Sequence, residues 1–245
     1  MEETTRLAKR MAVLGMCSRR EADGYILNGW VKVNGEIIKQ KGYKVKNSDK
    51  IEMSLEALEQ QKARVTILLH KPVGFVSGQP EKNYRPAVQL IRYKNLWRAD
   101  KSGIKYEDKH NQDLAPAGRL DIDSTGLLVL TQDGVIAKQL IGENSPIDKE
   151  YIVTVEGEIM ENGLKLLNFG LSLDGKKLKP AKVTWIQDNQ LRFILTEGKK
   201  RQIRRMCALV GLHVVALKRI RIGKVKLGDL PSGKWRYLSE NESFE

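Results

Sequence analysis

The sequence predicts an α+β fold in two domains: a small N-terminal domain of a helical hairpin plus β-strands, then a larger domain with a mixed, largely antiparallel central sheet. Three observations indicate this. The chain has 245 residues, enough for one large and one small domain. Helical and strand-like patterns alternate along it without an internal repeat. A polar, helix-prone stretch without glycine or proline, residues 55–64, has the character of a linker.

The composition is strongly basic. Lysine and arginine total 43 against 30 acidic residues, a formal net charge of +13. Such an excess favours a polyanionic partner, because each phosphate contact by a basic side chain releases counterions. The alternative is that the charges only aid solvation. The 41% hydrophobic fraction is typical of a globular chain with a sizeable core.

Cysteine use and the N-terminus indicate a cytoplasmic protein. Cys17 and Cys207 are too far apart to suggest a disulfide framework or a zinc site, which fits a reducing compartment. Residues 1–5 lack a signal-peptide pattern, and no apolar run approaches the roughly 18 residues that span a membrane. The three histidines are dispersed. We therefore expect no membrane association and no bound metal. The sequence gives no sign of obligate oligomerisation, so we expect a monomer.

The N-terminal domain, residues 1–60, begins with two predicted helices. Residues 6–15 carry apolar side chains at helical spacing, and Ser18 with Glu21 forms a capping box that begins a second helix. Gly29 ends that helix in a left-handed conformation. The inward-facing positions of the second helix are Ala22, Tyr25 and Ile26.

Short strands complete this domain. Val31 and Val33 alternate with polar residues, and Asn34-Gly35 is typical of a type I′ hairpin turn. Residues 36–38 form the returning strand of the hairpin. Residues 51–53 form a last short strand.

The second domain, residues 65–240, opens with an apolar strand over 65–69 that residues 70–74 break. Residues 79–115 are polar with little periodicity, which is typical of a functional loop or an insertion. Another apolar strand includes residues 127–130. Further along, the patterns predict a strand over 150–156, a helix over 160–169, a hairpin of 181–186 with 191–196, and a helix over 202–210 that ends at Gly211.

Asp121 is a candidate catalytic residue, since it lies in a loop bounded by Gly118 and Gly126 just before an apolar strand. A carboxylate held there can act as a nucleophile or base. Judged from these residues alone, however, Asp121 is more simply a turn residue whose side chain hydrogen-bonds to its own backbone. Asp123 suggests a glycosidase-like carboxylate pair, but side chains two residues apart usually diverge.

Residues 198–228 contain ten lysines or arginines and no acidic residue. As a helix, residues 202–210 place one set of side chains inward, namely Ile203, Met206, Cys207 and Val210. The opposite face carries Arg201, Arg204 and Arg205. Such one-sided charge indicates a phosphate-binding surface.

These segments resemble the motifs of the pseudouridine synthases. Lys71-Pro72-Val73-Gly74, Gly118-Arg119-Leu120-Asp121, Lys149-Glu150-Tyr151 and Gly198 to Met206 match four family blocks in order. Residues 17–23 and 31–35 resemble an S4 RNA-binding domain. The chain is therefore similar to S4-domain-containing pseudouridine synthases of the RsuA/RluB/RluE/RluF family, most of all to the RluF branch.

The resemblance implies an RNA pseudouridine synthase that isomerises a uridine of 23S rRNA without a cofactor. Asp121 would be the nucleophile or base, Tyr151 would stack on the flipped uracil, and Arg204 would pair with Asp121 to keep it ionised. The RNA-binding residues implied by family and charge together are Arg19, Arg20, Lys32, Lys71, Arg119, Arg201, Arg205 and Arg219. Alternatives are a 16S rRNA or tRNA target, a non-catalytic S4-type ribosome-assembly protein, and a hydrolase using Asp121 with Asp123.

Overall fold

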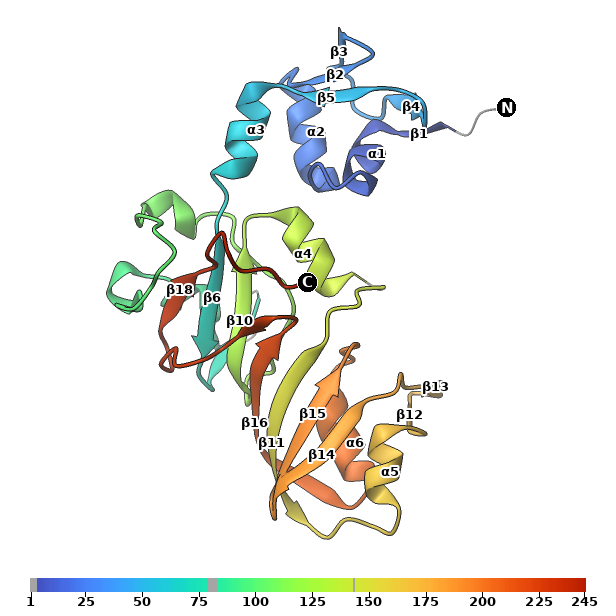
Figure 1. Ribbon diagram of the computed structural model, residues 1–245, viewed down its shortest axis with the longest axis vertical. Helices are drawn as coiled ribbons and strands as arrows, with labels where there is room; N and C mark the ends of the chain where they lie inside the picture. Colours follow the sequence, from blue (N-terminus) through green and yellow to red (C-terminus); the bar gives the residue numbers. More distant parts are fainter. Residues whose placement is uncertain (1–3, 79–82, 143) are drawn as a thin grey trace.

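The computed structural model describes residues 4–78, 83–142 and 144–245. Figure 1 shows a small N-terminal body above a long, twisted sheet, with helix α3 leading from one to the other. The N-terminal elements are β1 (Thr4–Arg6), α1 (Leu7–Val13), α2 (Arg19–Leu27), β2 (Val31–Val33), β3 (Glu36–Ile37), β4 (Lys44–Lys46), β5 (Ile51–Met53) and α3 (Leu55–Lys62).

The predicted turns and caps of the N-terminal body are present. The Ser18 side chain accepts a hydrogen bond from the Glu21 amide at 3.3 Å, and the Glu21 carboxylate accepts one from the Ser18 amide at 2.5 Å. Asn34 and Gly35 have φ angles of 51° and 88°, as a type I′ turn requires. The predicted inward side chains Ala22, Tyr25 and Ile26 are buried.

Most of the predicted linker, residues 55–64, is helix α3, which packs on the N-terminal core. Ser54 caps α3 by accepting a hydrogen bond from the Ala57 amide. Ala57 is fully buried among the apolar side chains of α1, α2 and β2. The helix is amphipathic only weakly, so its one buried alanine gives little signal in the sequence.

The remaining chain is built on a nine-stranded sheet whose main path runs β14-β15-β11-β16-β10-β6-β18. All neighbours on this path are antiparallel except β10 and β16, so the predicted mixed, largely antiparallel sheet is confirmed. The sheet strands are β6 (Thr66–Lys71), β9 (Ala115–Pro116), β10 (Thr125–Thr131), β11 (Lys149–Gly157), β14 (Lys182–Gln187), β15 (Gln190–Leu195), β16 (Leu212–Ile222), β17 (Val225–Lys226) and β18 (Trp235–Tyr237).

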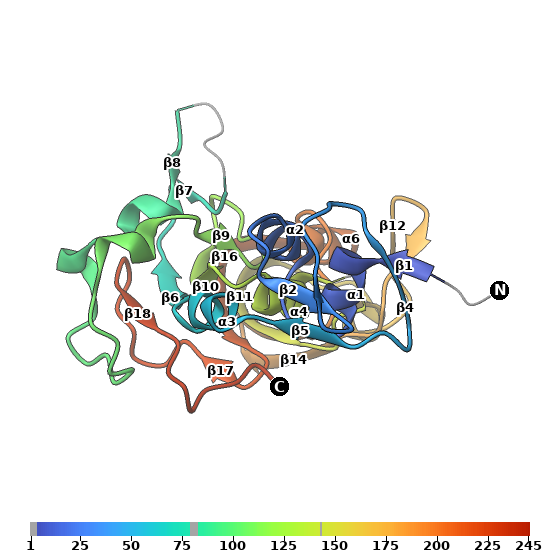
Figure 2. The ribbon, with the colours of Figure 1, turned by 90° about the horizontal axis from the view of Figure 1, so that it is seen from above.

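The helices that accompany the sheet in the described residues are α4 (Gly134–Ile141), α5 (Gly163–Asn168) and α6 (Gln202–Leu209). Figure 2 gives the view of these helices and strands from above. The predicted buried face of α6 is confirmed, with Gly211 following in the left-handed region at φ 88°. Strands β7 (Phe75–Val76) and β8 (Arg85–Pro86) form a short parallel pair, and β12 (Ser172–Leu173) forms a small antiparallel hairpin with β13 (Lys176–Lys177).

Some element boundaries differ from the prediction. Strand β6 continues through His70 and ends at Lys71, because the next residue, Pro72, has no amide hydrogen to donate. Helix α5 begins at Gly163, three residues later than predicted. Helix α4 and strand β16 were missed. In β16, basic residues interrupt the apolar alternation that would have indicated a strand.

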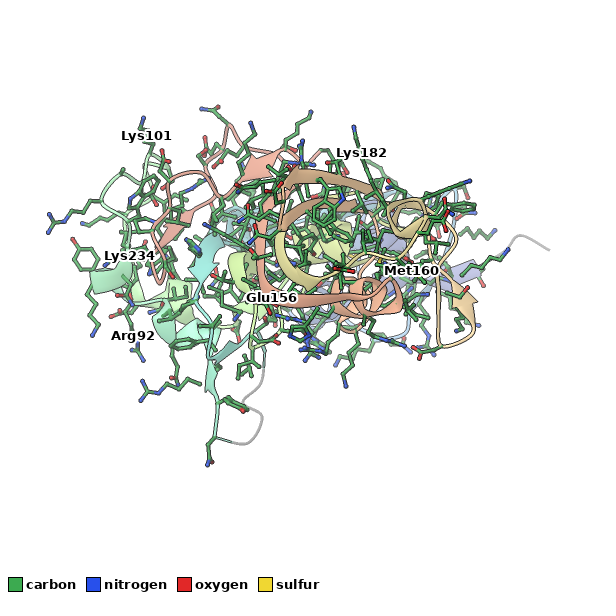
Figure 3. All side chains as sticks on the ribbon, turned by 90° about the horizontal axis from the view of Figure 1, so that it is seen from below. Arg92, Lys101, Glu156, Met160, Lys182 and Lys234 are labelled. Atoms are coloured by element: carbon green, nitrogen blue, oxygen red, sulfur yellow. The ribbon has the colours of Figure 1, made fainter. Side chains whose placement is uncertain are left out.

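The long segment before the Asp121 loop, described from residue 83 to 115, packs on the sheet. Three 3-10 helices, Ala87–Leu90, Tyr93–Asn95 and Asp108–Asn111, follow one another along it. Ala87 and Ile91 are buried in the main core. Figure 3 shows Arg92 and Lys101, with Lys234, at the end of the molecule that this segment forms. Residues 79–82 lie outside the described residues.

The N-terminal body is held on the sheet body by a polar contact centred on Glu21. Its Oε1 accepts hydrogen bonds from the Gly134 amide at 3.0 Å and from the Arg64 guanidinium. Arg64 also donates to the Gln132 carbonyl at 2.8 Å and to the Tyr25 hydroxyl at 3.2 Å. Nearby, Lys138 donates to the carbonyl of a residue in α1 at 3.0 Å. These contacts join α2, the end of α3 and the β10–α4 turn.

Within the described residues, no helix is long and apolar enough to cross a membrane. The same part of the chain contains no group of three or more His, Cys, Asp and Glu side chains placed to hold a metal ion. Cys17 and Cys207 are both free and buried, and burial raises the pKa of each thiol to about 12.

Candidate active site

The backbone of the loop around Asp121 is fixed on both sides. The Ser77 hydroxyl donates to the Leu120 carbonyl at 2.7 Å and accepts from the Leu120 amide at 2.8 Å. The Gly74 amide donates to the Ile122 carbonyl at 2.9 Å. The Ser124 amide donates to the Asp121 carbonyl at 3.0 Å, which closes a four-residue turn. The Asp121 side chain therefore projects from a rigid turn.

Gly126 lets this turn join the sheet. Its φ is 112°, a conformation that side-chain-bearing residues rarely adopt. A Cβ at this position would overlap the backbone carbonyl oxygen of Arg219 on β16. Glycine therefore allows the parallel pairing of β10 with β16 that carries the loop into the core.

The carboxylates of Asp121 and Asp123 converge on one arginine, so the expectation that they diverge is wrong. Arg201 binds Asp123 in a bidentate pair, with Nη1–Oδ1 at 3.2 Å and Nη2–Oδ2 at 3.0 Å. The same Nη1 lies 3.8 Å from Asp121 Oδ2. The turn from Asp121 to Ser124 brings both side chains to one side, as an extended segment would not.

The pairing expected between Arg204 and Asp121 also differs in the structure. Arg204 Nη2 lies 3.2 Å from the Asp123 carboxylate and donates to the Asp123 carbonyl at 3.1 Å, while Nη1 donates to the Val214 carbonyl at 2.8 Å. In the described part of the chain, Asp121 has its ion pair with Arg201. Arg201 is the N-cap residue just before α6 and is in the left-handed region, at φ 50°.

Positively charged side chains lie close to the two carboxylates. Burial acts to raise the pKa of Asp123, but the hydrogen bond from Arg201 and the charges of Arg204 and Arg201 outweigh it and lower the pKa. Burial lowers the pKa of Lys71 to about 8, although Asp123 and Asp121 oppose that shift. Asp123 is thus ionised at neutral pH and cannot serve as the protonated acid that a glycosidase pair needs.

A cleft of about 850 Å³ opens beside Asp121, within the usual size range of small-molecule sites. Tyr151 on β11 and Leu217 on β16 contribute apolar surface, and Lys149 contributes a cation. Tyr151 is 9% exposed, so one side of its ring lies against the core. The cleft joins the Asp121 turn, the end of α4, the start of β11 and the start of α6.

Three of the residues expected to bind RNA are placed otherwise. Lys71 is fully buried, and its Nζ donates to the Pro72 and Phe75 carbonyls at 2.9 Å each. Arg219 is 1% exposed and donates from Nε to the Leu127 carbonyl at 2.7 Å. Arg205 forms a bidentate pair with Asp174, at 3.0 and 2.6 Å, away from the cleft. Lys71 and Arg219 fix the backbone around the site, and neither presents its charge to a phosphate.

The other expected RNA-binding residues are on the surface. Arg19, Arg20 and Lys32 are exposed on the N-terminal body, and Arg119 and Arg201 are exposed at the cleft. No role was predicted from the sequence for two residues of the site, Ser77 and Lys149. Burial lowers the pKa of Lys149 to about 8, with the Arg219 charge adding to that effect. Lys149 stands in a family block, which was its one available signal.

Comparison with known proteins identifies the architecture. The family model described as RNA pseudouridylate synthase matches residues 65–209, more than half of the chain, and the S4 domain model matches residues 5–51. The chain belongs to the RNA pseudouridylate synthase family. It is therefore a pseudouridine synthase, an isomerase, with an N-terminal S4 RNA-binding domain. This membership decides against the hydrolase and the non-catalytic alternatives.

Named relatives of this pseudouridine synthase span nearly its whole length. The dual-specificity RNA pseudouridine synthase RluF of Escherichia coli K12 is 34% identical over 100% of this chain and 79% of its own. Ribosomal large subunit pseudouridine synthase B of Bacillus subtilis is 35% identical over 97% and 93%. A crystal structure of a pseudouridylate synthase superimposes with a TM-score of 0.64 at 28% identity, covering 96% of each chain.

Proposed function

We propose that this pseudouridine synthase isomerises a specific uridine of 23S rRNA and that Asp121 begins the reaction as nucleophile or base. One observation carries the assignment of Asp121. Its carboxylate projects from a rigid turn into a cleft of nucleoside size and lies 3.8 Å from a cation. The large-subunit target is supported by the Bacillus subtilis relative, which is a ribosomal large subunit pseudouridine synthase.

The proposed reaction is an isomerisation that balances without an added reagent. The bond between uracil N1 and ribose C1′ breaks, the uracil turns within the cleft, and a bond forms between C5 and C1′. The proton on C5 is lost and N1 gains one. Asp121 acts at the first step, either on C1′ or by removing a ribose proton.

Other side chains of the cleft have supporting roles in this proposal. Tyr151 stacks on the flipped uracil and then helps to remove the C5 proton. Arg204 and Arg201 supply positive charge beside the two carboxylates, at 3.2 Å and 3.0 Å from Asp123. Arg119, exposed on the same loop as Asp121, helps to open the RNA around the target.

The RNA would extend from the cleft to the N-terminal domain. We propose residues 1–60 as the RNA-binding domain and residues 65–240 as the catalytic domain. Arg19, Arg20 and Lys32 are exposed there and available for phosphate contacts. Since phosphate contacts release counterions, binding weakens steeply as salt rises.

The target is tested by incubating the purified protein with unmodified 23S rRNA, 16S rRNA and tRNA. Pseudouridine is then mapped by reverse-transcription stops after carbodiimide treatment. One new stop in 23S rRNA is expected. A stop confined to 16S rRNA or to tRNA would replace the proposed substrate, and no stop in any RNA would overturn the proposed activity.

A further inference from the structure

The segment described from residue 83 to 115 presents an exposed aromatic ring that no step of the proposed reaction uses. Tyr93, on the short 3-10 helix Tyr93–Asn95, is 70% exposed. A single exposed tyrosine is ordinary on a protein surface, but this one is the outer member of a series of rings. Its ring centroid lies 5.5 Å from that of Tyr106, which lies 6.1 Å from that of Trp235. Trp235 is fully buried, so the core supports the exposed ring from beneath.

The backbone on both sides of Tyr93 is fixed to β18 and the residue before it. The Trp235 indole donates to the Arg92 carbonyl at 3.0 Å, and the Lys234 ammonium donates to the Lys94 carbonyl at 2.9 Å. These bonds use main-chain atoms of Arg92 and Lys94, so substitution of either side chain leaves the bonds in place. A ring held on an ordered turn loses little conformational entropy when a ligand binds to it.

The charge around this ring is positive. Residues 92–105 contain five basic residues and one acidic residue. The basic residues are exposed and form no ion pair with another described residue: Arg92, Lys94, Arg98, Lys101 and Lys105. The acidic residue, Asp100, turns inward, since its two carboxylate oxygens accept from the Ser102 amide at 2.7 Å and the Tyr237 amide at 2.8 Å. The charge of this surface is therefore available to an anionic partner.

This surface is separate from the cleft beside Asp121. In the described part of the chain, the lining of the cleft begins only at Pro116. Strand β18 lies two strands from β10 in the sheet, about 10 Å at the usual strand spacing. Figure 1 shows the segment beside β18, at the edge of the sheet opposite β14 and β15. A polymer bound in the cleft can therefore extend to this edge.

We propose that residues 92–105, with Tyr93 at their centre, form an additional binding surface for unpaired nucleotides of the RNA substrate. A base stacks on the Tyr93 ring, and stacking of this kind accepts any base that is not already paired and stacked in a helix. Arg92 and Lys94, on either side of that ring, contact the neighbouring phosphates. The inference needs only that the protein acts on RNA, and it holds whichever RNA is the target.

The test is ultraviolet crosslinking of the full-length protein to unmodified 23S and 16S rRNA transcripts, with crosslinked peptides identified by mass spectrometry. We expect a crosslink at Tyr93. Affinity is then measured for a single-stranded RNA oligonucleotide and for a blunt RNA duplex of the same sequence. Tyr93→Ala should lose the crosslink and bind the single strand about tenfold more weakly, while its affinity for the duplex stays within about twofold of the wild type.

Two further variants separate the ring from the charges. Tyr93→Phe keeps an aromatic ring and should bind the single strand within about twofold of the wild type. The double variant Arg92→Gln with Lys94→Gln should weaken binding to both RNAs and lower the slope of log affinity against log salt by about two. Melting temperatures of all variants are compared with the wild type to show that the fold is retained.

Matched controls come from the other end of the sheet. Phe169, which follows α5, is 66% exposed, and Lys182 is exposed on β14. Figure 3 shows Lys182 well away from Arg92 and Lys234. Phe169→Ala and Lys182→Gln therefore remove an exposed ring and an exposed charge outside the proposed surface. Both should match the wild type in crosslinking and in affinity for the single strand.

Three results overturn the inference. One is a wild-type protein that crosslinks to rRNA elsewhere but not within residues 92–105, which would leave this surface to another partner, such as an acidic protein. Another is an equal loss of affinity for single strand and duplex in Tyr93→Ala, and the third is a similar loss in the controls. None of these measurements needs turnover. The proposed function fails separately, if the wild type releases no tritium from [5-³H]uridine-labelled RNA.

Discussion

Replacing Glu21 with alanine should release the S4 domain from the catalytic domain. Glu21 caps α2 through the Ser18 amide, and its other oxygen binds the Gly134 amide and Arg64. The variant therefore removes one contact inside the S4 domain and two that cross to the catalytic domain or to the segment joining it. The two crossing contacts determine the docking.

The expected magnitude follows from how deeply these groups lie. The Glu21 and Arg64 side chains are 9% and 18% exposed, so removal of one partner leaves a largely desolvated charge, at a cost of about 3–5 kcal/mol. The Gly134 amide also loses its acceptor, at about 1–3 kcal/mol when it stays buried. These costs overlap, because the opened domain rehydrates both groups. We therefore expect Glu21→Ala to weaken the docking of the two domains by about 3 kcal/mol, which raises the population of the opened form roughly a hundredfold.

Hydrogen–deuterium exchange read by mass spectrometry is the appropriate assay. Peptides over 60–66 and 131–138 cover the contact, and in Glu21→Ala they should exchange much faster than in the wild type. The control is Glu36→Ala on β3, exposed on the far side of the S4 domain from the sheet (Figure 1). Exchange in these peptides within twofold of the wild type would refute the view that Glu21 holds the domains together.

Two further predictions concern the support of the catalytic turn. Ser77→Ala removes both hydrogen bonds to Leu120, so we expect tritium release to slow by about tenfold at unchanged RNA affinity, with Ser77→Thr restoring it; an unaffected rate would contradict this. Burial lowers the pKa of Lys71 to about 8, below the unfolded value near 10.5, so the unfolded chain holds more protons between these limits and stability rises with pH. Lys71→Met should lose that rise, and a melting-temperature difference from the wild type that is constant between pH 7.5 and 10.5 would contradict it.

Short-range signals predicted much of this structure. The capping box at Ser18, the turn at Asn34-Gly35 and the buried face of α6 depend on residues within a few positions of one another, and all three are present. The Asp121 loop was also visible, because its glycines and apolar strand lie in one segment. Such features depend on neighbouring residues, so they can be predicted from a short stretch of sequence.

Features that depend on distant partners were not predictable. Ser77 binds Leu120 across 43 positions, and nothing near Ser77 indicates that contact. Lys71 and Arg219 appeared to be RNA contacts because charge usually means exposure, yet backbone carbonyls satisfy both within the fold. Asp121 pairs with Arg201, where Arg204 was expected, and Arg204 lies beside Asp123. Arg201 has a left-handed conformation just before α6, which no local sequence signal indicated.

The central claim is that Asp121 initiates uridine isomerisation from the turn that Ser77 and Gly74 hold. The most direct test is tritium release from [5-³H]uridine-labelled 23S rRNA by wild type and Asp121→Asn, with RNA affinity and folding measured for both. The account predicts no detectable turnover by Asp121→Asn, at least about 10⁴-fold below the wild type, with the fold and most RNA binding retained. Turnover by that variant within tenfold of the wild type would contradict it.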